Sequence, residues 1–301
     1  MNILLTGKNG QLGFELQRAL APLGEVVAVD AADCDLTDTA AIDALLARVQ
    51  PGVIVNPAAY TAVDRAEREP DLAAAVNVGA PQRFGDWAAA QGALVLHYST
   101  DYVFDGAKPG RYVEDDPTAP LGVYGLTKRD GEVALRAACP QHLILRTSWV
   151  VGAHGANFAK TMLRLAAERE QLRVVADQWG APTAAALLAD LSAHLVRQWL
   201  RGSAAGAAGG FPYGTYHVAN AGETTWCDYA RFVLQTALDA GRTLRIRPEQ
   251  VEAITTAEYP TPAARPLNSR LDCSRFERTF GLRLPPWQAG VRHLLAQILD
   301  V

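Results

Sequence analysis

A glycine-rich turn near the amino terminus limits most strongly how this chain can fold. A short apolar strand at residues 2–5 runs into Gly7, Gly10 and Gly13, and a helical pattern follows over residues 14–20. In such a strand–turn–helix, the first glycine makes the tight turn and the second lets the backbone approach a pyrophosphate. The third lets the helix pack closely on the strand. We therefore predict a dinucleotide-binding turn, although three glycines alone also fit a plain strand–helix connection.

An acidic residue closes the next strand at the spacing that such a turn requires. Asp30 follows Gly7 by about twenty residues, where a carboxylate accepts hydrogen bonds from the adenosine ribose. Its charge would repel a 2′-phosphate, so this feature favours NADH over NADPH. Asp35 and Leu36 come soon after. They could flank the adenine, or Asp35 could only cap the following helix.

Strands and helices alternate along the first half of the chain. Strands are expected at residues 2–5, 25–29, 51–56, 93–98 and 142–146, and helices at 14–20, 40–49, 72–91 and 124–138. The helix at 72–91 should break or kink near Pro81. Such alternation predicts an α/β fold with a parallel sheet and right-handed crossovers, a Rossmann-like doubly wound sheet.

The pattern changes near residue 150. Helices are expected at residues 157–171, 184–201, 226–240, 274–280 and 287–299, strands at 173–175 and 216–219, and a flexible Gly/Ala-rich loop at 202–214. We divide the chain into a dinucleotide-binding domain at residues 1–150 and a smaller mixed α/β substrate domain at residues 151–301. Segments of the later part are expected to return to the first domain.

Composition excludes several classes of partner. The net charge of −4 provides no field for nucleic acid or an anionic membrane. No apolar run is long enough to span a bilayer, and the amino terminus shows no signal-peptide pattern, which favours the cytoplasm. The four cysteines stand far apart, which indicates reduced thiols rather than disulfides or metal ligands: Cys34, Cys139, Cys227 and Cys273.

Two segments carry the side chains with reactive groups. A buried strand ends in Ser99 and Thr100, and about twenty residues later Tyr124 precedes Lys128 by four positions. On a helix the phenol and the ammonium share one face, and with a strand-end hydroxyl they can polarise a carbonyl. Because alternate strand residues face opposite ways, we expect Thr100, rather than Ser99, to point at that carbonyl.

This hydroxyl–tyrosine–lysine set resembles the short-chain dehydrogenase/reductase superfamily. A Tyr-x-x-x-Lys pair is common by chance, but lysine occurs in this chain only at positions 8, 108, 128 and 160. The resemblance implies that Tyr124 exchanges the proton at a carbinol oxygen and that Thr100 helps to bind the carbonyl. It also implies that Lys128 lowers the pKa of Tyr124 and holds the nicotinamide ribose.

At a finer level the chain resembles the dTDP-4-dehydrorhamnose reductase family along nearly its whole length. The matching segments are residues 1–13, 56–67, 97–104, 123–128, 146–150, 157–162, 177–183 and 259–271. The resemblance implies that NADH or NADPH reduces the C4 ketone of dTDP-4-dehydro-β-L-rhamnose to dTDP-β-L-rhamnose. This reaction belongs to dTDP-L-rhamnose synthesis for cell-surface polysaccharide.

The family resemblance also assigns site residues. Cofactor contacts fall on Gly10, Gln11, Leu12, Asp30, Asp35, Leu36, Ala59, Tyr60, Thr61, Tyr98, Tyr124 and Lys128. Substrate contacts fall on Thr100, Asp101 and Trp149. We add Tyr102, Arg265 and Arg270 as substrate residues, since a diphosphate is bound well by bidentate cations. The alternative for the two arginines is a solvated loop.

Some family members hold magnesium at a dimer contact built from glutamates. Glu15 stands at one such position, Ala186 occupies another, and the third glutamate is not evident near Arg292. Because a cation needs several oxygen ligands, we predict no metal site. A homodimer is possible.

Two rival functions stay open. The first is a nucleotide-sugar dehydratase or epimerase. Dehydratases carry an Asp-Glu pair after the threonine, whereas Asp101 and Tyr102 follow here, which argues against elimination. The second is a non-enzymatic regulatory subunit of the methionine adenosyltransferase type. The intact Thr100, Tyr124 and Lys128 favour an enzyme.

Overall fold

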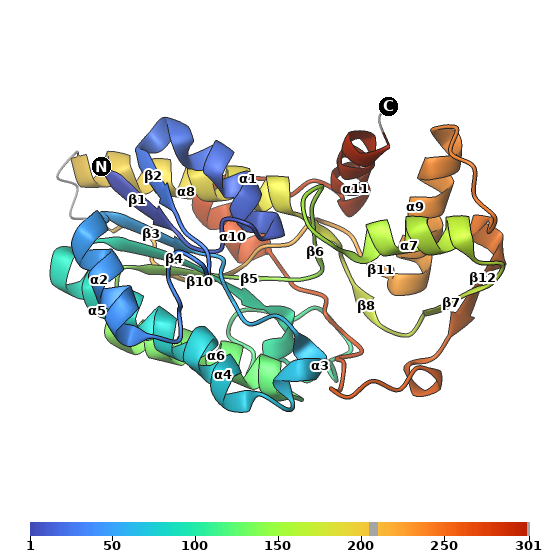
Figure 1. The fold of residues 1–301 in the computed structure, drawn as a ribbon, viewed down its shortest axis with the longest axis horizontal. Coiled ribbons are helices and arrows are strands. Elements are labelled where there is room, and N and C mark those ends of the chain that lie inside the picture. Colours follow the sequence, from blue (N-terminus) through green and yellow to red (C-terminus); the bar gives the residue numbers. More distant parts are fainter. Residues whose placement is uncertain (205–209, 300–301) are drawn as a thin grey trace.

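A parallel sheet of six strands forms the centre of the larger part of the molecule (Figure 1). The structure is a computed structural model that describes residues 1–204 and 210–299. The strands lie in the order β2 (Glu25–Ala28), β1 (Asn2–Leu5), β3 (Val53–Asn56), β4 (Leu94–Thr100), β5 (His142–Thr147) and β10 (Gly214–His217). All neighbours pair in parallel, which confirms the predicted α/β doubly wound fold.

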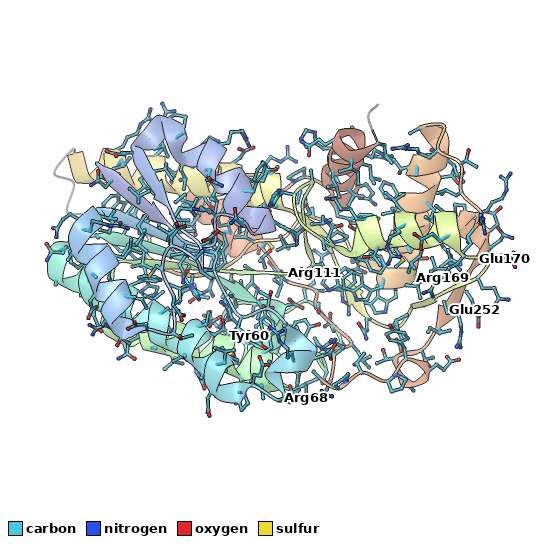
Figure 2. All side chains as sticks on the ribbon, in the orientation of Figure 1. Tyr60, Arg68, Arg111, Arg169, Glu170 and Glu252 are labelled. Carbon is cyan, nitrogen blue, oxygen red and sulfur yellow. The ribbon has the colours of Figure 1, made fainter. Side chains whose placement is uncertain are left out.

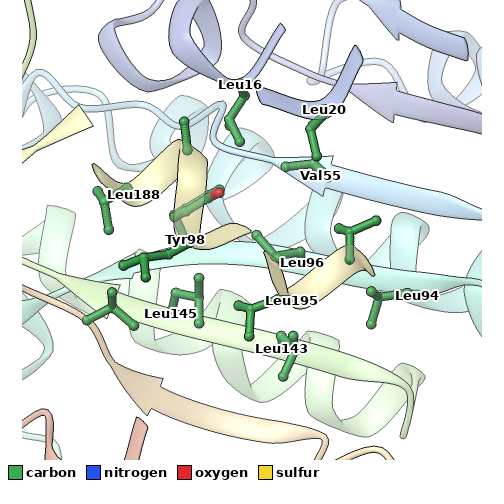
Figure 3. Close-up of a cluster of buried hydrophobic side chains, with 14 of the residues drawn as sticks. Leu16, Leu20, Val55, Leu94, Leu96, Tyr98, Leu143, Leu145, Leu188 and Leu195 are labelled. Atoms are coloured by element: carbon green, nitrogen blue, oxygen red, sulfur yellow. The ribbon is translucent and has the colours of Figure 1, made fainter. Parts of the chain in front are cut away.

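Helices cover both faces of this sheet. One face carries α1 (Gln11–Leu20) and α8 (Ala185–Ala204), and the other carries α2 (Thr39–Val49), α5 (Ala80–Gln91) and α6 (Val123–Ala138). Strands buried on both faces are expected to be apolar throughout, and β3, β4 and β5 are buried along their whole lengths. Figure 3 shows the first of the two cores, in which Leu16, Leu96 and Leu188 pack between the sheet and the helices.

The register brings the carboxyl ends of the central strands to one edge. Asn56 at the end of β3 pairs with His97 of β4, and Thr100 pairs with Thr147 at the end of β5. Strand β4 runs two residues further than predicted and continues into the 3₁₀ helix η3 (Asp101–Val103). In open parallel sheets, ligands bind beyond this edge.

The helix expected at residues 72–91 is interrupted, as predicted, but by a change of helix type. It consists of α4 (Pro70–Ala74), the π-helical turn η2 (Ala75–Gly79) and α5. Such π-turns are rare and occur often near functional sites. A short helix, α3 (Val63–Ala66), precedes this region.

The smaller part of the molecule has its own apolar core. Its longer elements are α7 (Phe158–Glu168), β7 (Leu172–Val175), α9 (Trp226–Asp239), β12 (Val251–Ile254) and α11 (Trp287–Ile298). Short strands pair as β6 (Val150–Val151) with β9 (Thr183–Ala184), β8 (Trp179–Gly180) with β11 (Thr224–Thr225), and β7 with β12. Three 3₁₀ turns complete the elements: η1 (Ala21–Leu23), η4 (Pro248–Gln250) and η5 (Thr256–Glu258).

Segments of the later half return to the first sheet. Helix α8 packs on α1, β10 supplies the sixth strand, and α10 (Ser274–Phe280) packs beside β10. Of the loop predicted at residues 202–214, the first three residues continue α8, and residues 205–209 lie outside the described residues. A domain boundary at residue 150 stays a prediction, because the chain crosses between the two cores more than once.

Two further expectations concern membranes and thiols. In residues 1–204 and 210–299, no helix combines the length and the apolar character needed to cross a membrane. All four cysteines are free thiols, as predicted. Cys34, Cys139 and Cys227 are buried, and Cys273 is partly exposed.

Candidate active site

Two cavities lie side by side and share Trp226 in their walls. The strand-end cavity, of about 560 Å³, lies beyond the carboxyl ends of the central strands. The outer cavity, of about 720 Å³, lies between α7, β7 and the loop at residues 259–265. The strand-end cavity gathers most of the predicted site residues: Gly7, Gly10, Gln11, Leu12, Gly13, Ala59, Thr61, Tyr98, Thr100, Asp101, Tyr102, Tyr124, Lys128 and Trp149.

The glycine-rich turn has the close approaches that were expected of it. Gly7 has a φ of +61°, and a Cβ on Gly13 would lie 2.0 Å from the carbonyl oxygen of Gly7. Helix α1 begins at Gln11, three residues earlier than predicted, so its free N–H groups open onto the strand-end cavity. The turn can therefore hold a phosphate by its backbone.

The Gln11 side chain ties the turn to the smaller part of the molecule. Its Oε1 accepts hydrogen bonds from the backbone N–H of Gly152, at 2.9 Å, and from the Asn157 amide, at 3.2 Å. Its Nε2 donates to the carbonyl of Val150 at 3.3 Å. Contact with a cofactor is therefore left to the backbone of Gln11.

Asp30, two residues beyond β2, lies beside the glycine-rich turn and does not line the strand-end cavity. Its carboxylate accepts hydrogen bonds from Asn9 and from the backbone N–H of Ala32. Next to it, the Lys8 ammonium pairs with Asp33 at 2.5 Å. An anion and a cation thus both lie where an adenosine ribose would bind, and the preference for NADH over NADPH stays a prediction.

Local contacts hold the side chains of three predicted cofactor residues, Asp35, Leu36 and Tyr60. Asp35 accepts hydrogen bonds from the backbone N–H and the hydroxyl of Thr37, at 2.9 and 2.8 Å. Leu36 packs against the core under α2. The Tyr60 hydroxyl, whose residue is labelled in Figure 2, binds Glu69 and accepts a hydrogen bond from Arg65. None of the three lines the strand-end cavity, and their contact with a cofactor stays a prediction.

Thr100 and Tyr124 lie close together at the end of β4 and the start of α6. The Thr100 hydroxyl donates to Asp101 at 3.0 Å and accepts the backbone N–H of Tyr102 at 3.2 Å. The rings of Tyr102 and Tyr124 meet edge to face with centroids 5.5 Å apart. A hydroxyl and a phenol therefore face the same space, as the sequence predicted.

Tyr124 holds its proton tightly. Burial raises the pKa of its phenol to about 12, a hydrogen bond with Thr100 opposes the rise, and the charge of Asp101 adds to it. The sequence led us to expect that Lys128 lowers this pKa. In the structure burial dominates, and the Lys128 ammonium is bound elsewhere: it donates to the Tyr98 carbonyl at 2.7 Å and contacts His97 Nε2 at 3.2 Å.

Lys128 is buried deep beneath the strand-end cavity. Burial lowers the pKa of its ammonium to about 8, and the Glu132 carboxylate one turn along α6 opposes the shift. Glu132 forms a bidentate pair with Arg146 at 2.8 and 2.7 Å. Burial would raise the pKa of Glu132, and the bonds from Arg146 lower it. Ser99 and Thr100 both line the strand-end cavity, so the preference for Thr100 at the carbonyl stays a prediction.

Asp101 carries a free acceptor at the floor of the strand-end cavity. Its Oδ2 is buried and has no hydrogen-bond partner in the part of the chain that the structure describes. Burial raises the pKa of the carboxyl to about 6, against the hydrogen bond from Thr100. A ligand hydroxyl at this point would satisfy the free oxygen.

An aromatic wall separates the two cavities. Trp149 stacks on Trp226 with ring centroids 3.7 Å apart. Its backbone has a φ of +48°, which costs free energy for a residue that is not glycine. A Cβ on Gly180 would lie only 2.6 Å from the Trp149 ring, so a glycine there leaves room for the indole.

The two arginines proposed to bind a diphosphate lie in different surroundings. Arg265 lines the outer cavity and pairs with Asp64 at 2.8 Å through Nη2. Its Nη1 is buried and, within residues 1–204 and 210–299, has no partner. Arg270 instead donates to Asn268 at 2.8 Å and to the Pro109 carbonyl at 2.9 Å, away from both cavities.

Three site residues escaped the sequence analysis. Asn56 and His97 are buried behind Lys128, and Trp226 lies in the wall of both cavities. A histidine inside an otherwise apolar strand could have signalled the first two. Among the described residues, no three His, Cys, Asp or Glu side chains are grouped to hold a metal ion, and the absence of a metal site stays a prediction.

Comparison with known proteins gives consistent matches over nearly the whole chain. The RmlD substrate binding domain family matches residues 1–299. The dTDP-4-dehydrorhamnose reductases of Salmonella typhimurium and Escherichia coli are each 48% identical, over 99% of this chain and 98% of theirs. The crystal structure of dTDP-4-dehydrorhamnose reductase from Bacillus anthracis in complex with NADP is 34% identical and superimposes with a TM-score of 0.87, over 98% of this chain and 99% of that one.

Proposed function

The chain belongs to the RmlD substrate binding domain family, that of the dTDP-4-dehydrorhamnose reductases, and from this we propose the reaction that it catalyses. It reduces the C4 ketone of dTDP-4-dehydro-β-L-rhamnose to dTDP-β-L-rhamnose with NADH or NADPH. One observation carries the proposal beyond the family match. Thr100, Tyr124 and Lys128 line the same cavity as the glycine-rich turn.

The residues present fit a dinucleotide. Gly7, Gly10 and Gly13 form a close-packed cradle at the start of α1, and a Cβ on Gly13 would collide with it. The turn and Asp30 would hold the adenosine diphosphate, and Ala59, Thr61, Tyr98 and Lys128 would surround the nicotinamide ribose. A bound reduced nicotinamide supplies the hydride.

The chain's own groups then handle the carbonyl oxygen. The Thr100 hydroxyl turns from Asp101 to donate a hydrogen bond to it, and the Tyr124 phenol gives it a proton as the C4 alkoxide forms. Because burial keeps Tyr124 protonated at neutral pH, the phenol is ready to act as the acid. The Lys128 ammonium stabilises the phenolate that results. Proton donation of this kind contributes about 10²–10⁴-fold to the rate.

The nucleotide sugar would extend across both cavities. Its sugar lies against Thr100, Asp101, Tyr102 and Trp149, and its nucleoside diphosphate reaches the outer cavity past Trp226. Arg265 carries an unused buried N–H for the diphosphate. The apolar wall of the outer cavity, with Phe158, Met162 and Leu165, suits a flat base.

Assembly and location complete the proposal. We place the protein in the cytoplasm, in keeping with its four free thiols. A homodimer is the assembly to test, by light scattering of the purified protein.

The experiment follows nicotinamide absorbance with the 4-keto sugar nucleotide as substrate. We expect stoichiometric oxidation of NADH or NADPH and a product whose C4 configuration by NMR is that of L-rhamnose. An epimerase would consume no net NADH, and a dehydratase would change the substrate at C5 and C6. A regulatory subunit would turn nothing over and would co-purify with a second chain. Any of these three results rejects the proposal.

A further inference from the structure

A line of buried polar side chains runs behind the strand-end cavity to Lys128. The Thr6 hydroxyl lies 2.6 Å from Asn56 Oδ1, Asn56 Nδ2 lies 3.0 Å from His97 Nδ1, and His97 Nε2 lies 3.2 Å from Lys128 Nζ. Thr6 directly follows β1, the other three side chains come from β3, β4 and α6, and each of the four is at most 2% exposed. The register of the sheet sets the spacing, since Asn56 and His97 are paired across β3 and β4.

Counting hydrogens shows that this line has two possible directions. A neutral imidazole carries one N–H. If Asn56 donates its amide hydrogen to Nδ1, the histidine hydrogen is on Nε2 and points at Lys128, which must then be a neutral amine. If Lys128 is an ammonium, Nε2 must accept, so Nδ1 carries the hydrogen and donates to Asn56 Oδ1. The amide of Asn56 is then turned over, and its Nδ2 faces Thr6.

The second direction applies at neutral pH, because Lys128 is then an ammonium: burial lowers its pKa only to about 8, and its Nζ donates to the Tyr98 carbonyl at 2.7 Å. His97 is kept neutral, because burial lowers its pKa well below the usual value and the charge of Lys128 adds to this. The carboxylate facing Lys128 from its own helix is Glu132, which is already paired with Arg146 from β5. From β4 the ammonium meets only the Tyr98 carbonyl and His97 within the described residues. Two further titratable groups, Tyr124 and Asp101, line the same cavity as Lys128.

We propose that His97 is a positioning residue, whose Nε2 accepts a hydrogen bond from the Lys128 ammonium while Asn56 holds the imidazole in the Nδ1–H form. His97 touches neither hydride nor carbonyl. It fixes the ammonium beneath Tyr124 and stabilises its charged state in a site where burial opposes charge. The role rests on the proposed function, in which that ammonium stabilises the Tyr124 phenolate.

Two variants separate the two ends of the imidazole. In His97→Gln, the amide oxygen reaches the position of Nε2 and can still accept from Lys128. In His97→Asn, the amide reaches only the position of Nδ1, so the bond to Asn56 is kept and the bond to Lys128 is lost. Both variants place one amide in the same buried space, so each is the control for the other in folding.

The readout is the pH profile of kcat. In the wild type, activity should fall as the pH rises through the pKa of Lys128, since the ammonium is the required form. His97→Asn should move this alkaline limb about one pH unit lower, the effect of one lost charge-assisted hydrogen bond. At pH 8 its kcat should fall about fivefold, with much of the loss recovered at pH 6. His97→Gln should keep the limb in place and lose about twofold. Identical limbs in the two variants overturn the proposal.

A measurement on the wild-type protein tests the proposal even if the variants do not fold. With ¹⁵N-labelled histidine, NMR at pH 7 should show a neutral His97 with hydrogen on Nδ1. Hydrogen on Nε2, or a charged imidazolium, rejects the proposal. If the wild type proves to have no reductase activity, the proposed function fails while this NMR test still decides the role of His97.

Discussion

The buried Tyr124 side chain is a protonated phenol, which can act as an acid, rather than a phenolate. Burial holds its pKa at about 12, so the phenol carries its proton whenever a ketone arrives. We predict that Tyr124→Phe lowers kcat by about 10²–10⁴-fold and leaves the dissociation constant of NADH within about twofold. Stopped-flow kinetics and fluorescence titration with NADH measure the two effects. Turnover at the wild-type rate would remove Tyr124 from the mechanism.

Asp101 lowers the stability of the folded protein and keeps one carboxylate oxygen free to accept a hydrogen bond. Its folded pKa, about 6, lies above the ordinary value of 3.8, so the carboxyl costs stability once it is ionised. This cost is absent below about pH 4, develops between about pH 4 and 6, and amounts to about 2–3 kcal/mol at pH 8. We predict that Asp101→Asn is more stable than the wild type at pH 8 by that order, and that the gain fades between pH 6 and 4. Urea unfolding at several pH values measures it, and a gain independent of pH would show that the charge is not its cause.

Single residues were predictable from sequence where spacing alone carries the chemistry. The glycine intervals and the Tyr124–Lys128 pair are of this kind, and the structure brings them into one cavity. His97 and Asn56 could not be found this way, because they meet Lys128 only through the strand register. Arg270 was proposed for substrate on charge alone, and local hydrogen bonds to Asn268 and Pro109 hold it away from the cavities.

Among the elements, α6 packs very closely against its neighbour η2. A Cβ on Gly131 would lie 2.0 Å from the carbonyl oxygen of Asn77, so α6 and the π-turn η2 touch through their backbones. We predict that Gly131→Ala destabilises the protein by about 1–3 kcal/mol, although alanine is the better helix former. It should also lower kcat, since α6 carries Tyr124 and Lys128. Thermal unfolding and steady-state kinetics report the two effects.

Gly79 offers the matched control for this helix pair. It has helical dihedrals, and a Cβ there would meet nothing within 4 Å among the described residues. Gly79→Ala should therefore stabilise the protein by up to about 1 kcal/mol. Equal destabilisation by both substitutions would mean that the contact between α6 and η2 is not what Gly131 serves.

Long elements could be predicted and short ones could not. The strands of the central sheet and the helices α2 and α6 follow their apolar patterns closely. Strands such as β6 and β11 have two residues each, too few for any period. The π-turn was expected only as a break near Pro81, because its hydrogen bonding depends on how closely α6 approaches.

For the molecule as a whole, the proposed substrate path runs from the strand-end cavity into the outer cavity, and the two cavities share Trp226. Arg265 stands on this path, and Arg270 does not. We predict that Arg265→Gln raises the KM for the nucleotide sugar by about 10–100-fold, the effect of a lost charge-assisted contact, and leaves the KM for NADH unchanged. Arg270→Gln, the control, should leave both values within about twofold. Equal effects of the two substitutions on the KM for the nucleotide sugar would contradict a role of Arg265 in binding it.

The arrangement of the two parts was only partly predictable. Returning segments were expected, but nothing in the pattern of residues 214–217 indicates that they form the sixth strand of a sheet begun at residue 2. That pairing depends on the α8 crossover and on the packing of Phe276 and Phe280 beside β10. The two cavities share Trp226 only because the chain crosses between the two parts of the molecule in this way.

The most direct test of the proposed reaction follows the hydride itself. With NADH carrying two deuterium atoms at nicotinamide C4 and dTDP-4-dehydro-β-L-rhamnose as substrate, NMR of the product should show one deuterium at C4 of the sugar. The sugar should have the L-rhamno configuration, and its formation should match NADH oxidation one for one. Deuterium at any other carbon, or a product formed without consumption of NADH or NADPH, would contradict the account.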